Sequence, residues 1–133
     1  MAERSGAGTA EGLDGVIADL RALSEDIESC AVLSGDGDLI SSSHGPGVDR
    51  ERVGAILAAL VNLAGRVARE SGKGRISQLR IDTGGGHLLL VRLDGGGVLA
   101  ATTGPEARVG LVLYDMRNSR GEVEKVLAEG SDR

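Results

Sequence analysis

The stretch VGAILAALVNLAGRVA, from Val53 to Ala68, decides how this chain folds. It contains two polar residues, Asn62 and Arg66, and no proline, and Asp49 precedes it as a helix N-cap. The pattern predicts a helix over residues 49–71, ended by glycines. This helix is shorter than the roughly 20 apolar residues that cross a bilayer, yet it is apolar around most of its circumference. We therefore expect one side to pack on this chain and the other side on a second chain.

The composition limits the classes of protein that fit. A length of 133 residues suits one domain, and 41% hydrophobic residues can build a core. A net charge of -5 disfavours nucleic acid as the main partner, and a single aromatic residue, Tyr114, excludes a base-stacking platform. One cysteine, Cys30, cannot form an internal disulfide, and no segment has the pattern of a signal peptide or a membrane span. These features predict a cytoplasmic protein.

Hydrophobic periodicity predicts alternating groups of helices and strands. In chain order the predicted elements are a helix with apolar positions Leu13, Val16, Ile17, Leu20 and Leu23, strands at 29–34 and 39–43, the helix at 49–71, strands at 75–83, 87–93 and 98–103, and a helix at 106–128. Asp-Gly pairs between successive strands favour tight antiparallel hairpins. We expect residues 1–11 to be a flexible tail, residues 12–128 to form one domain, and residues 129–133 to be a second tail.

The motifs of common enzyme and metal sites are missing from the sequence. Lys73 lies between two glycines and lacks the Ser or Thr that ends a nucleotide-binding P-loop. The turn at residues 35–38 carries two carboxylates, but Gly47 occupies the position where a calcium loop needs Glu. His44 and His87 lie in different elements, and the serine next to His44 points to the opposite side of its strand. We therefore expect no catalytic residues, no bound metal and no cofactor.

Three segments resemble the bacterial branch of the Roadblock/LC7 family, which has actinobacterial members. They are AVLSGDGDLISSS at residues 31–43, the helix entry at residues 11–20, and VLAATTGPEARVGLVLYDM at residues 98–116 leading into GEVEKVL. The order and spacing of these segments match the family from about Leu13 to Leu127. One departure is the polar run Arg117-Asn118-Ser119-Arg120, where relatives are often more apolar.

The resemblance implies a fold and a mode of self-association. The implied fold is α+β, with the order α-β-β-α-β-β-β-α: a five-stranded antiparallel sheet has the long central helix on one face and the terminal helices on the other, as in profilin. Family members typically form homodimers through their third strands and central helices. In this chain the corresponding dimer interface is Val53, Ile56, Leu57, Leu60, Leu63, Ala64, Val67, Ile76, Gln78 and Arg80.

The resemblance also implies a small Ras-like GTPase as partner, which the protein would regulate or scaffold without catalysis of its own. A group of basic residues is a possible partner surface: Arg66, Arg69, Lys73 and Arg75. A solvated basic face is the alternative interpretation of that group. Two other functions stay open, a self-assembling structural module without a GTPase and a small-molecule sensor. The sensor is disfavoured because the chain has almost no aromatic residues to line a cavity.

Overall fold

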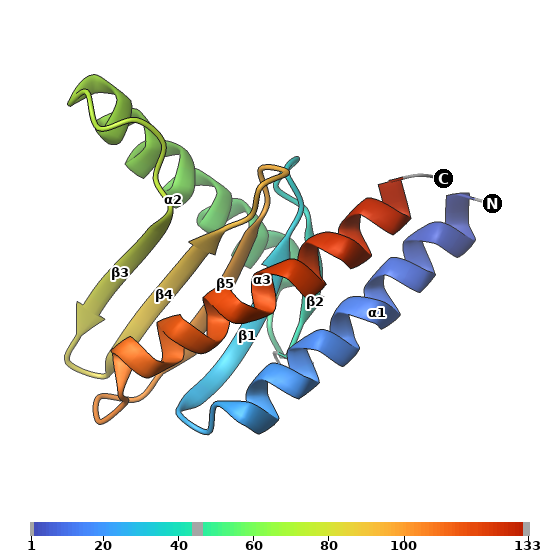
Figure 1. Cartoon of the computed structure of the whole chain (residues 1–133), viewed down its shortest axis with the longest axis horizontal. Helices are drawn as coiled ribbons and strands as arrows, with labels where there is room; N and C mark the ends of the chain where they lie inside the picture. Colours follow the sequence, from blue (N-terminus) through green and yellow to red (C-terminus); the bar gives the residue numbers. More distant parts are fainter. Residues whose placement is uncertain (1, 44–46, 132–133) are drawn as a thin grey trace.

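The computed structural model describes residues 2–43 and 47–131, which form three helices and five strands (Figure 1). In chain order these are α1 (Ala2–Leu23), β1 (Ile27–Leu33), β2 (Leu39–Ser42), α2 (Arg50–Glu70), β3 (Gln78–Thr83), β4 (Gly86–Arg92), β5 (Val98–Thr103) and α3 (Val109–Ser131). This order confirms the prediction. None of these helices is both long enough and apolar enough to cross a membrane.

The five strands form one sheet with the order β2-β1-β5-β4-β3. Every neighbouring pair is antiparallel, including the central pair, in which Ile27 of β1 lies opposite Thr103 of β5. The predicted five-stranded antiparallel sheet is therefore confirmed. Because β2 and β3 are the outer strands, each has a free edge in the monomer.

Alternation along the strands divides the apolar residues between two cores, one on each face of the sheet. On one face Val32, Leu89 and Leu99 pack with α1 and α3. On the other face Leu33 and Leu90 pack with α2. Figure 1 shows α1 and α3 side by side across one face and α2 behind the other. The predicted layering, with the central helix opposite the terminal helices, is confirmed.

Helices α1 and α3 extend into the segments predicted as tails. Among the described residues, 2–11 and 129–131 are helical. The two helices run antiparallel at close range: a Cβ added at Gly12 would lie 2.9 Å from Val126, and one added at Gly130 would lie 2.1 Å from Oγ1 of Thr9. The close approach occurs at two glycines, and glycines do not add to a pattern of large apolar residues in the sequence.

Helix α2 begins and ends as its flanking residues predict. The side chain of Asp49 accepts a hydrogen bond from the backbone N–H of Arg52 at 3.1 Å, which caps the helix. After the C-cap residue Ser71, Gly72 has a φ of 69°, a conformation that glycine adopts without strain. The end of α2 projects past the sheet (Figure 1). The strand after it is shorter than predicted, since β3 begins at Gln78 and not at Arg75.

Candidate interaction surface

Helix α2 exposes large apolar side chains that this chain does not cover. Leu57 is 7% exposed and packs on the sheet, whereas Ile56 and Leu63 are each 58% exposed and Val67 is 66% exposed. A single exposed apolar side chain is common in proteins, but three exposed apolar side chains on one helix form an apolar surface. The start of α2 also leaves an apolar hollow of about 150 Å³ against the sheet, lined in part by Val53, Leu57 and Leu88. This face of the monomer is therefore only partly covered.

The free edge of β3 belongs to the same end of the sheet as the projecting helix. Leu79 packs against the α2 side of the sheet, and Gln78 accepts a hydrogen bond from Nη1 of Arg117 on α3 at 3.0 Å, on the opposite side. Successive residues of β3 therefore face opposite sides of the sheet. Of the described strands, only β4 pairs with β3, so its outer backbone groups can accept another strand.

The residues predicted for the dimer interface divide into three groups by their exposure. Leu57 is buried within this chain's own core, and Val53 and Leu60 pack partly against that core. The half-buried members are Val53, Leu60, Ala64 and Ile76, and the exposed members are Ile56, Leu63, Val67, Gln78 and Arg80. The exposed group is the part of the prediction that a second chain could contact without rearrangement.

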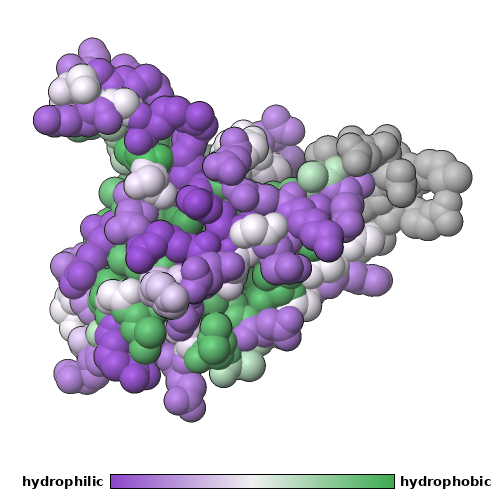
Figure 2. Space-filling view, in the orientation of Figure 1, coloured by the Kyte–Doolittle hydropathy of each residue, from purple (hydrophilic) through white to green (hydrophobic). Residues whose placement is uncertain are grey.

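The predicted basic residues all lie at the projecting end of α2 and in the connection to β3. Their side chains are exposed, and they are Arg66, Arg69, Lys73 and Arg75. Figure 2 shows that hydrophilic residues cover this projecting part. These residues lie near one another because they belong to one short segment of the chain.

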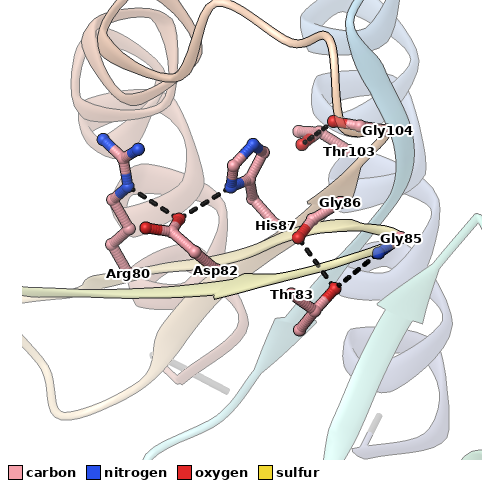
Figure 3. A network of polar contacts seen from close by, with 8 residues as sticks. All are labelled: Arg80, Asp82, Thr83, Gly85, Gly86, His87, Thr103 and Gly104. Carbon is pink, nitrogen blue, oxygen red and sulfur yellow. Dashed lines mark hydrogen bonds and ion pairs between the residues drawn. The ribbon is translucent and has the colours of Figure 1, made fainter.

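A polar network joins β3 to β4 near their hairpin (Figure 3). Oδ1 of Asp82 accepts from Nε of Arg80 at 2.9 Å and lies 2.7 Å from Nδ1 of His87. The hydrogen bond from Arg80, followed by that from His87, lowers the pKa of the Asp82 carboxyl group. Thr83 completes the turn: its hydroxyl donates to the carbonyl of Gly86 at 2.9 Å. These hydrogen bonds connect β3 to β4 in the hairpin at the edge of the sheet.

The groups that could supply chemistry are scattered or buried. Within residues 2–43 and 47–131 no three His, Cys, Asp or Glu side chains are grouped so that they could hold a metal ion. Cys30 is 1% exposed and packs as a small apolar residue, and burial raises the pKa of its thiol to about 12. His44 lies outside the described residues, and so does the serine-histidine arrangement considered for it.

One charged hollow was not predicted from the sequence. It has a volume of about 210 Å³ and lies where β4 ends and β3 begins. Arginines from three segments line it: Arg75, Arg92 and Arg120. Only Arg75 was a candidate site residue, since no local motif connects arginines so far apart in the sequence.

Comparison with known proteins places this architecture in a family. The model of the Roadblock/LC7 domain matches residues 13–103. No curated protein matches the chain. Among solved structures, MglB from Myxococcus xanthus superposes with a TM-score of 0.80 at 17% identity, covering 90% of each chain. A Roadblock/LC7 domain from Streptomyces avermitilis gives 0.78 at 22% identity, covering 86% of this chain and 97% of that one.

A more distant solved structure shows the breadth of the fold. Profilin IB from Acanthamoeba castellanii matches with a TM-score of 0.62 at 14% identity, covering 84% of this chain and 97% of that chain. The predicted likeness to profilin is therefore confirmed at the level of the fold. Because the family model spans more than half of the sequence, the chain belongs to the Roadblock/LC7 domain family.

Proposed function

We propose that this protein is a non-catalytic, homodimeric regulator or scaffold that binds a small Ras-like GTPase in the cytoplasm. Membership of the Roadblock/LC7 family supports the GTPase partner. The exposed apolar side chains of α2 carry the proposal of a dimer, because Ile56, Leu63 and Val67 face water in the monomer. A partner chain of the same sequence offers them an equally apolar surface.

In the proposed dimer, the α2 helices of two copies lie side by side and the two β3 edges pair. Complete burial of a Leu, Ile or Val side chain contributes about 1.5–3 kcal/mol, against which the entropy cost of association must be set. Strand pairing supplies hydrogen bonds for backbone groups that are otherwise left to water. A solved MglB that shares this fold is described with a tetrameric arrangement, which supports self-association.

The exposed basic residues at the end of α2 are the proposed contact for the GTPase. Arg66, Arg69, Lys73 and Arg75 concentrate positive charge on a chain whose net charge is -5. Such a patch attracts an acidic surface and increases the rate of association more than the final affinity. We therefore expect the rate of association with the GTPase to fall as salt is added.

The oligomeric state tests the first half of the proposal. Light scattering of the purified chain at micromolar concentration should give a mass near twice that of the 13.6 kDa monomer. A mass of 13.6 kDa across that concentration range would contradict the dimer.

Direct binding tests the second half. The purified Ras-like GTPase encoded nearest to this chain's gene would be loaded with GDP or a GTP analogue and titrated with the dimer. We expect binding that prefers one nucleotide state and that Arg69→Glu combined with Lys73→Glu weakens. Arg52→Glu, an exposed charge reversal at the start of α2, is the matched control. A dimer that binds neither nucleotide state would instead support a self-assembling module without a GTPase.

A further inference from the structure

The hollow at the end of β4 gathers positive charge from segments far apart in the sequence. Arg75 belongs to the connection between α2 and β3, Arg92 is the last residue of β4, and Arg120 lies in the middle of α3. Its remaining lining comes from Ile76, Ser77, Leu93 and Asp94. In Figure 1, α3 passes across the sheet while the start of β3 and the end of β4 lie side by side.

Among the described residues, the arginines of this hollow have no anionic partner. Of the described residues, none forms a salt bridge with Arg75, Arg92 or Arg120, although the chain has 20 acidic residues. Asp94 is the one carboxylate among the lining residues, so formal charges of three plus and one minus leave the hollow at about +2. The neighbouring Glu124 does not line the hollow, and its carboxylate accepts a hydrogen bond from the backbone N–H of Asp94. Like charges held near one another repel unless an anion lies between them.

Arg92 adds an observation of a different kind. Its Nε is buried and has no hydrogen-bond partner among the described residues. A buried donor without a partner is rare in folded proteins, and an acceptor supplied by a ligand would satisfy it. The backbone N–H of Arg92 donates to the carbonyl of Ser77 at 2.9 Å, which fixes the main chain at the rim of the hollow.

We propose that this hollow binds a phosphate group, either as inorganic phosphate or as the phosphoryl group of a larger molecule. Guanidinium groups match the oxygens of phosphate and hydrogen-bond to them in pairs. A phosphate monoester carries a charge of about −1.5 to −2 at pH 7, which balances the charge of the lining. The volume of about 210 Å³ lies below the ~300–1,000 Å³ of pockets that enclose drug-sized ligands, so the hollow suits one anionic group.

Titration of the full-length chain with inorganic phosphate tests the site. At low ionic strength, two-dimensional ¹H–¹⁵N spectra should show saturable shifts of the amides of Ser77, Leu93 and Asp94 at millimolar phosphate. Phosphoserine should shift the same amides if the group can be carried by a larger molecule, whereas acetate, with one negative charge, should bind more weakly. If inorganic phosphate shifts these amides and phosphoserine does not, the site binds only the free phosphate ion.

Variants separate the proposed site from general electrostatics. Arg120→Gln and Arg92→Gln should each weaken phosphate binding by about tenfold or more, because each removes charge-assisted hydrogen bonds. Asp94→Asn should strengthen it, and Asn-Gly suits the same hairpin turn as Asp-Gly, so the fold is kept. Arg52→Gln is the matched control, an equal loss of charge at an exposed position of α2.

The phosphate site can be tested even if one of these variants does not fold. If Arg92→Gln does not fold, Arg120→Gln and the exposed Asp94→Asn still report on the site. Absence of saturable shifts with phosphate, or equal losses in Arg120→Gln and Arg52→Gln, would overturn the proposal. The titration uses this chain without a GTPase, so a negative result there leaves the function proposed above standing.

Discussion

The carboxylate of Asp26 accepts two hydrogen bonds from Arg108, one from the backbone N–H at 2.9 Å and one from Nε at 3.1 Å. Asp26 lies between α1 and β1, and Arg108 immediately precedes α3. One side chain thus satisfies a backbone donor at the start of α3 and joins segments 82 residues apart in the sequence. The backbone hydrogen bond, followed by the side-chain one, lowers the pKa of the Asp26 carboxyl group.

This contact predicts an acid-sensitive share of the stability. Because the pKa of Asp26 is lower in the folded chain than its ordinary value of 3.8, its contribution is present above that value and is lost as the pH falls through the folded pKa. Asp26→Asn should lower the melting temperature at pH 7 and flatten its dependence on pH below about 4. Thermal unfolding followed by circular dichroism measures both effects. The exposed Asp19→Asn is the control, and equal acid profiles for both variants would refute the role of Asp26.

Two leucines of α2, Leu57 and Leu63, should behave in opposite ways when they are substituted. Leu63→Glu changes a side chain that is 58% exposed, so the chain should fold but become monomeric. Leu57→Ala removes a side chain that is 7% exposed and should cost about 2–5 kcal/mol of stability. Light scattering and thermal unfolding of both variants distinguish the two effects. If the Leu63→Glu protein stays dimeric, the dimer interface does not lie on this face of α2.

Gly86 should not tolerate a side chain. Its φ is 145°, and an added Cβ would lie 1.9 Å from the carbonyl oxygen of Thr103. Gly86→Ala should therefore destabilise the fold by more than about 1 kcal/mol, which lowers the melting temperature by several degrees. Gly85→Ala provides the matched control, because an added Cβ there meets no atom within 4 Å. Similar melting temperatures for the two variants would contradict the close approach at Gly86.

Cys30 should resist thiol reagents in the folded chain. With a pKa of about 12, a fraction of about one in ten thousand of the thiol is ionised at pH 8, and the thiolate is the reactive form. The reaction with a disulfide reagent at pH 8 should be slow in buffer and complete within minutes in denaturant. Rapid labelling without denaturant would show that β1 opens readily.

Most of the fold could be predicted from local patterns. The strand at Val98–Thr103 and the cap at Asp49 were found at their predicted positions, because alternation and capping depend on neighbours in the sequence. The first helix was predicted too short, since its contact with α3 uses Gly12, Thr9 and Gly130, which carry no apolar signal. Helix periodicity reports large apolar side chains and misses close contacts between small ones.

The candidate surface could be predicted in outline only. The sequence by itself determined that the helix from Val53 to Ala68 is apolar beyond the needs of one small domain, because its residues are consecutive. Only the tertiary structure decided that Leu57 is buried while Leu63 is exposed, since this depends on where the sheet lies beneath α2. It also decided that Arg92 and Arg120 line one hollow, because that requires the crossing of α3 over strands that are distant in sequence.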